Sequence, residues 1–135
     1  MEEQYFIANL AFGMSLALKM VVATDRQDAI QTIYDNYEHA NILGLLSLDE
    51  LDEIAKAADE GSTYFVTEVH KDGDRLITNS ITEKGSSLEQ LKIKYENRDT
   101  AIMNCDQMKT MVDGIYQWLQ REGTTQQPLL SNRLH

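Results

Sequence analysis

Acidic side chains are the densest chemistry-bearing feature of this chain. Closely spaced carboxylates attract basic surfaces and accelerate association with them. The same pattern is also typical of a solvated helix face that only keeps a protein in solution. We predict that six of these acids bind a partner, with solubilisation as the alternative: Asp35, Glu38, Asp49, Glu50, Asp52 and Glu53.

The net charge of −10 is concentrated in the first part of the chain. Residues 1–62 hold twelve acidic and three basic residues, a net charge of −9, which leaves −1 for the remaining 73 residues. Binding to a nucleic-acid backbone needs clustered Lys and Arg, so direct contact with nucleic acid is not expected. The charge favours a basic protein surface as the partner. A special case is nucleic-acid mimicry, in which carboxylates occupy the places of phosphates on a nucleic-acid-binding protein.

Sequence motifs of the common enzyme classes are missing from this chain. It has no phosphate-binding Gly-rich loop, no His-Glu-x-x-His, no Cys-x-x-Cys and no Gly-x-Ser-x-Gly. The run Asp72-Gly73-Asp74 could begin a calcium loop, but Ile77 occupies the place of the glycine such a loop requires. We therefore predict a protein that is not an enzyme and that holds no cofactor or metal.

The histidines and the cysteine are isolated in the sequence. His70 could act as a general base beside Glu68 or Asp72, although a surface histidine is the simpler interpretation. The single cysteine, Cys105, cannot form an intramolecular disulfide, which favours a reducing compartment. The chain begins with acidic residues instead of the basic segment of a secretory signal. These features predict a cytoplasmic protein.

Aromatic residues supply the alternative function. Tyr34, Tyr37 and Trp118 lie in segments with helical periodicity and could line a pocket between helices and sheet. Such a pocket would make the protein a small-ligand sensor or carrier. Aromatic residues on helix faces are more often part of a hydrophobic core, so this hypothesis ranks second.

The elements that position these residues begin with an apolar stretch over residues 6–22, in which every even position is apolar. A period of two predicts β structure, and Gly13 predicts the turn of a hairpin. A three-residue loop, Phe12-Gly13-Met14, would pair Leu10 with Leu16 and place all even residues on one face. Polar residues within the stretch disfavour a helix or a membrane span, so no membrane association is expected.

Two amphipathic helices are predicted next. Asp25 is a suitable N-cap for a helix that carries Ala29, Ile33 and Tyr34 on one face. An apolar segment follows at 42–46 and is expected to be a buried loop or short turn. Ser47 and Glu50 then fit a capping box for a helix over 48–60.

The second half of the chain is rich in β-forming residues. Segments 63–70 and 75–82 are predicted as a hairpin around Asp72-Gly73, with Val69 opposite Leu76. Residues 91–95 are expected to form a third strand, and a short fourth strand should end near Cys105, giving an antiparallel four-strand meander. A helix over 106–121, ended by Gly123, completes the pattern.

The predicted fold is therefore a single α+β domain over residues 1–122 with the order β-β-α-α-β-β-β-β-α. Residues 123–135 are expected to be a flexible tail unless Leu129-Leu130 docks onto the domain. Exposed strand edges also predict a homo-oligomer. The functional prediction is an acidic protein-binding module, such as an inhibitor, an immunity protein or an adaptor.

Overall fold

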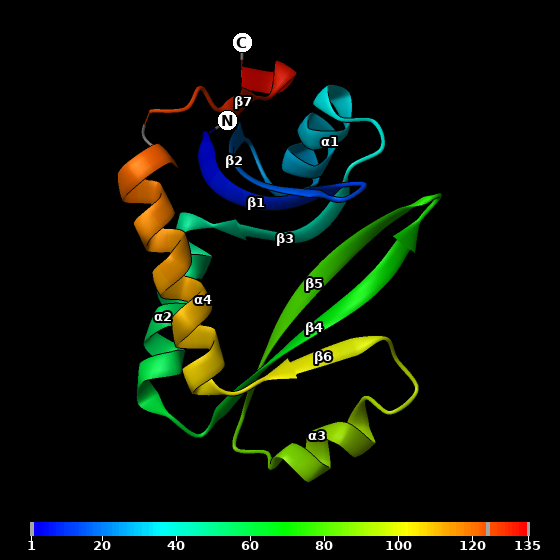
Figure 1. Ribbon diagram of the computed structural model, residues 1–135, viewed down its shortest axis with the longest axis vertical. Helices are drawn as coiled ribbons and strands as arrows, with labels where there is room; N and C mark the ends of the chain where they lie inside the picture. Colours follow the sequence, from blue (N-terminus) through cyan, green and yellow to red (C-terminus); the bar gives the residue numbers. More distant parts are fainter. Residues whose placement is uncertain (1, 124, 135) are drawn as a thin grey trace.

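The computed structural model describes residues 2–123 and 125–134, and it has the predicted α+β class. A mixed sheet forms its centre, and helices cover both faces of the part that contains the opening hairpin (Figure 1). The seven described strands are β1 (Gln4–Phe12), β2 (Ser15–Ala23), β3 (Asn41–Ser47), β4 (Thr63–Asp72), β5 (Arg75–Lys84), β6 (Thr100–Met103) and β7 (Leu129–Leu130). Their order across the sheet is β6-β4-β5-β3-β1-β2-β7.

Four α-helices accompany these strands in the described chain: α1 (Arg26–Asn36), α2 (Leu48–Glu60), α3 (Leu88–Lys94) and α4 (Cys105–Trp118). Helix α4 continues into a π-helical turn, Leu119–Gly123, and a 3₁₀ turn follows β7 at Asn132–Leu134. The capping box of Ser47 and Glu50 and the N-cap at Asp25 are both present, as predicted. None of the described helices is long and apolar enough to cross a membrane.

The hairpin of β1 and β2 exists, but its predicted register is wrong by one residue. Phe12 pairs with Ser15 across a two-residue turn, and Leu10 pairs with Ala17 instead of Leu16. Gly13 supports this tight turn because its φ of 57° is unfavourable for other residues. Even residues of β1 consequently share a face with odd residues of β2.

Strand β1 is buried on both faces, which explains the error. Its even residues, such as Phe6 and Leu10, pack with α1, whereas Ile7 packs with α2 and α4 on the other face. A strand between two helical layers needs apolar residues at its even-numbered and its odd-numbered positions, because both of its faces are buried. Alternation in the sequence therefore could not show which residues of the two strands share a face.

Residues 42–46 belong to strand β3, so the prediction of a loop there is wrong. Ile42 and Leu45 join the core beneath α1, and Leu46 packs on the opposite side with α2. The strand is antiparallel to β1, with a bulge between Asn9 and Leu10. A continuous apolar run of this length is typical of a strand covered on both faces.

Residues 91–95 are also assigned differently, because they belong to helix α3 and its C-cap instead of a strand. Ser87 and Gln90 form a capping box, and Leu91 and Tyr95, one turn apart, are buried against Val66. The four-strand meander is therefore absent from the described residues. Strand β6 pairs with β4, on the opposite side from β5.

The β4–β5 hairpin forms around Gly73-Asp74, one residue later than predicted. Asp72 faces Arg75 across the turn, and Val69 faces Thr78 instead of Leu76. Because the register differs from the prediction by two residues, each side chain keeps its predicted face of the sheet.

The sheet is split along a seam between β3 and β5. These parallel strands form a single residue pair, Ile42 with Ile77, and then diverge toward Ser47 and Lys84 (Figure 1). Arg26 bridges the split: its guanidinium donates to the carbonyl oxygen of Leu45 at 2.6 Å and to that of Thr78 at 3.3 Å. One side chain at the start of α1 thus connects the two parts of the sheet.

Replacing Arg26 tests the importance of this bridge. Arg26→Met keeps much of the aliphatic stem but removes both charged donors, so we expect the free energy of unfolding to fall by about 1.5–3 kcal/mol. Amide hydrogen exchange should accelerate in β3 and β5 more than in β2. The exposed neighbour provides the control, because Gln27→Met should change neither quantity. Equal stability of the two variants would show that the bridge contributes nothing.

The C-terminal segment docks onto the domain at Leu129-Leu130. These residues form β7, which runs parallel to β2 and pairs Leu129 with Val21. The backbone N–H of Ser131 donates to the carbonyl oxygen of Val22 at 2.9 Å, and Ser131 itself is buried. This part of the tail is thus a component of the sheet in the structure, beyond the predicted boundary at residue 122.

Asp28 connects this tail to α1. Its buried carboxylate accepts from the backbone N–H of Thr24 at 2.8 Å and from the Thr24 hydroxyl at 3.1 Å, and it lies 3.8 Å from the Arg133 guanidinium. Burial alone would raise the pKa of Asp28, but interactions with Ser131, Thr24 and Arg133 together lower it below its ordinary value of 3.8.

The lowered pKa predicts how stability depends on pH. The ionised carboxylate stabilises the fold above pH 3.8, and this contribution is lost as the pH falls through the lower pKa of the folded state. We expect Asp28→Asn to reduce the free energy of unfolding by about 1–3 kcal/mol at pH 7, and by less in strong acid. Urea denaturation of both proteins at pH values from 7 down to strong acid measures the difference in their free energy of unfolding. Asp35→Asn, at an exposed position of the same helix, should have little effect at any pH.

Candidate functional site: an acidic groove between α2 and β5

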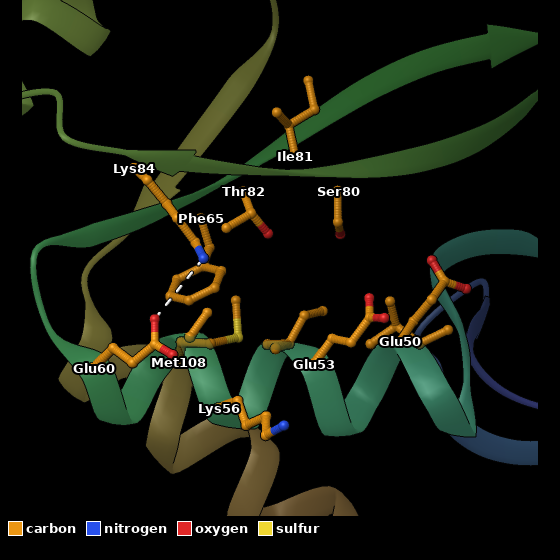
Figure 2. A pocket seen from close by; sticks show the side chains of 13 residues that line it. Glu50, Glu53, Lys56, Glu60, Phe65, Ser80, Ile81, Thr82, Lys84 and Met108 are labelled. Atoms are coloured by element: carbon orange, nitrogen blue, oxygen red, sulfur yellow. Dashed lines mark ion pairs between the residues drawn. The ribbon is translucent and has the colours of Figure 1, made fainter.

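A groove of about 410 Å³ lies between α2 and the part of β5 that has left β3. We call it the acidic groove (Figure 2). It exists because α2 starts directly after β3 and runs past the opening of the seam. Its lining comprises Leu46, Glu50, Glu53, Ile54, Lys56, Ala57, Glu60, Phe65, Ser80, Ile81, Thr82, Lys84 and Met108.

Two carboxylates are aimed into this groove from consecutive turns of α2. The capping box positions Glu50: its backbone N–H donates to Ser47 Oγ at 3.1 Å, and its Oε1 accepts from the Ser47 backbone N–H at 3.0 Å. Glu53 lies three residues later on the same side of the helix. Figure 2 shows both side chains rising toward β5, whereas Lys56 points away.

Strand β5 provides the opposite wall. The hydroxyl-bearing side chains of Ser80 and Thr82 point toward α2, and Ile81 points away from it (Figure 2). At one end, Lys84 Nζ lies 3.8 Å from a carboxylate oxygen of Glu60, but both side chains are largely exposed, so this ion pair contributes little to stability. The groove thus combines carboxylates, two lysines, hydroxyls and apolar side chains.

The other predicted partner-binding acids lie elsewhere on the molecule. Asp49 lies beside Glu2 and Glu3 near the start of β1. Asp35, on α1, accepts from Gln31 Nε2 at 2.8 Å. Glu38 follows α1, whose core contacts are on the opposite face of the sheet from those of α2. The groove therefore brings together only Glu50 and Glu53 of the six.

Asp52 links α2 to α4. Its carboxylate accepts a short hydrogen bond from the Tyr116 hydroxyl. Burial, together with this hydrogen bond and the negative charge of Asp52, raises the pKa of Tyr116 to about 12. Tyr116 therefore remains a neutral donor at physiological pH, and Asp52 is already engaged within the molecule.

The three aromatic residues of the alternative hypothesis do not line a common pocket. The Tyr34 ring lies under the Arg75 guanidinium, 3.5 Å from its centroid, and Tyr37 makes an edge contact with Phe12. Both tyrosines pack on the α1 side of the sheet, whereas Trp118 packs with the α2 and α4 core.

His70 and Cys105 lie outside the acidic groove. His70 is exposed, and the neighbouring Glu68 accepts from Arg98 at 3.1 Å. The Cys105 thiol lies 3.2 Å from the carbonyl oxygen of Thr63, within hydrogen-bond distance for sulfur. Within residues 2–123 and 125–134, no three His, Cys, Asp or Glu side chains are grouped as metal ligands.

Sequence reasoning missed the contribution of β5 to the groove. A signal was present, because Thr78, Ser80 and Thr82 repeat hydroxyl side chains at every second residue. This spacing predicts a polar face of a strand. Only the three-dimensional arrangement places Ser80 and Thr82 opposite the carboxylates of α2.

Comparisons of the chain with protein-family models, curated proteins and solved structures give no match.

Proposed function

We propose that this protein is a non-enzymatic binding module that holds a basic segment of a partner protein in the acidic groove. The position of Glu50 and Glu53 supports the proposal most directly. Both side chains face the groove, and neither forms an ion pair with a Lys or Arg among the described residues. Of the two lysines that line the groove, Lys84 pairs with Glu60, and Lys56 points away from β5. Lys or Arg side chains of a partner that entered the groove would therefore meet two carboxylates that are not ion-paired.

The shape of the groove favours an extended segment as the occupant. Beyond Thr78, β5 has no described strand on the side from which β3 diverges. An added segment could pair with this edge through its backbone, while its basic side chains reach α2 and its apolar ones reach Phe65 and Met108. One extended segment could thus form backbone hydrogen bonds, ion pairs and apolar contacts within the same groove.

The remaining acids support the same function at longer range. The first 62 residues carry a net charge of −9, which attracts a basic partner before contact is made. Inhibitors, immunity proteins and adaptors are all compatible with this mode of binding. If the partner binds nucleic acid, Glu50 and Glu53 would take the places of two phosphates.

A double substitution tests the proposal. Glu50→Gln/Glu53→Gln preserves side-chain size and the capping box but removes both groove charges, so we expect partner affinity to fall about tenfold or more. Asp35→Asn/Glu38→Gln removes the same charge outside the groove and is the matched control. Pull-downs from the native host identify the partner by mass spectrometry, and titrations at two salt concentrations then measure the affinity of each variant for it.

The control should retain nearly wild-type affinity, and the groove variant should lose part of the salt dependence. If the groove variant bound the captured partner as tightly as the wild type, the acidic groove would not be the binding site. Equal weakening by both variants would assign the effect to net charge alone and would also contradict the proposal.

Self-association remains a prediction from the sequence. The outermost described strands, β6 and β7, contain four and two residues, and such short edges offer few backbone groups to a second copy. If two copies nevertheless pair, light scattering at rising protein concentration should give a mass approaching twice 15.4 kDa. A constant mass of 15.4 kDa would exclude the homo-oligomer.

A further inference from the structure

A second cavity, of about 410 Å³, adjoins the acidic groove and shares four lining residues with it: Leu46, Ile54, Ser80 and Met108. We call it the seam cleft. Residues of β1, β2, β3, β4 and β5 form one wall, and α2 and α4 form the other. Its volume is within the range of about 300–1,000 Å³ that is typical of small-molecule pockets.

Two glycines leave this cleft open. A Cβ atom at Gly114 of α4 would have no neighbouring atom within 4 Å, apart from its own helix backbone and chain neighbours. A Cβ at Gly44 of β3 would meet only the Asn9 Cβ, at 3.7 Å. Both glycines line the cleft, so each wall lacks a side chain that could occupy the space. The hollow is therefore a property of the sequence as well as of the diverging strands.

The lining of the seam cleft carries no charged side chain, in contrast to the acidic groove. Leu, Ile and Met side chains make up most of it, and Leu43 and Met111 are more than a third exposed. An ion placed against such a surface would lose its hydration without gaining a partner of opposite charge. The chemistry of the cleft thus selects a neutral, largely apolar occupant.

Three polar side chains give the cleft a means of orienting that occupant. Asn9, Thr67 and Ser80 line it, and none of them forms a side-chain hydrogen bond with the described part of the chain. Thr67 and Ser80 are paired across β4 and β5, so their hydroxyls lie on the same face of the hairpin. A hydroxyl, carbonyl or amide of a ligand could therefore bond to them.

From these observations we infer that the seam cleft binds a neutral small molecule with an apolar body and one hydrogen-bonding group. This inference does not rest on the proposed partner in the acidic groove, although the two sites share Leu46, Ile54, Ser80 and Met108. The two sites are adjacent, but their linings differ in charge and so select different classes of ligand.

A fluorescent probe tests the inference directly. N-phenyl-1-naphthylamine is neutral and apolar, and its emission rises in apolar surroundings; we expect saturable binding of one molecule per chain. Gly114→Leu should fill the cleft and weaken binding at least tenfold. The substitution also favours the helix, so thermal unfolding should show a folded protein. Gln117→Leu, at an exposed position outside the cleft, adds the same side chain and should bind like the wild type.

Methyl spectra of the methionines locate the probe. Met108 and Met111 line the cleft, whereas Met14 is fully exposed at the tip of the opening hairpin. Binding should shift the methyl resonances of Met108 and Met111 in the wild type and leave that of Met14 unchanged. Unsaturable fluorescence, unchanged Met108 and Met111 resonances, or full binding by Gly114→Leu would each overturn the inference.

Competition tests the selection for neutral ligands. We expect 1-decanol to displace the probe at a concentration at least tenfold lower than decanoate, because the two share the same chain length but differ in charge at pH 7. Thr67→Val/Ser80→Ala should weaken displacement by decanol severalfold more than it weakens binding of the probe. Equal displacement by the alcohol and the carboxylate would contradict the assignment of a neutral ligand.

Discussion

The structure depends on how β3 and β5 remain joined where the sheet splits. A single residue pair starts the contact, and the Arg26 guanidinium continues it by bonding to carbonyl oxygens on both strands. The Thr78 hydroxyl adds a hydrogen bond to the carbonyl oxygen of Leu43 at 2.6 Å. Because regular pairing stops there, helices α2 and α4 pack across a divergence in the sheet. Both cavities lie beside this divergence.

The two cavities illustrate how one backbone arrangement supports different chemistry. On one side, α2 presents Glu50 and Glu53 to the hydroxyls of β5. On the other, the same helix presents Leu51 and Ile54 to an uncharged space. Helix α2 is amphipathic and lies at the split in the sheet. Its acidic residues and its apolar residues therefore both line cavities and are available for binding.

Local patterns predicted much of the fold. The capping box at Ser47, the N-cap at Asp25 and the turn glycine at Gly13 depend on neighbouring residues only, and each is present. Strand β3 and helix α3 were misassigned because short apolar or alternating segments fit both strand and helix until their packing partners are known. Leu91 and Tyr95, for example, also have the alternation expected of a strand.

The candidate site was less predictable than the fold. Glu50 and Glu53 were among the six acids selected from the sequence. The capping box identifies Glu50 as a residue of the first helical turn, but nothing local shows that Glu50 and Glu53, rather than Asp49 or Asp52, face a groove. The difference arises because Asp52 meets Tyr116 of α4, 64 residues away in the chain, whereas Glu50 and Glu53 face β5. The glycines of the seam cleft likewise do not reveal a cavity in the sequence. A missing side chain leaves a cavity only where the sheet and the helices face each other, and the sequence does not show which residues face each other.

The seam also has a consequence for the order in which the chain folds. Hairpins β1–β2 and β4–β5 join neighbouring segments, whereas Ile42 and Ile77 are separated by 35 residues. Closing a longer loop costs more conformational entropy, so the two hairpins are favoured to form before the strands between them meet. Arg26 can make its two bonds only after both parts have formed. The seam is then a late contact in folding, and its two strand edges are exposed until it closes.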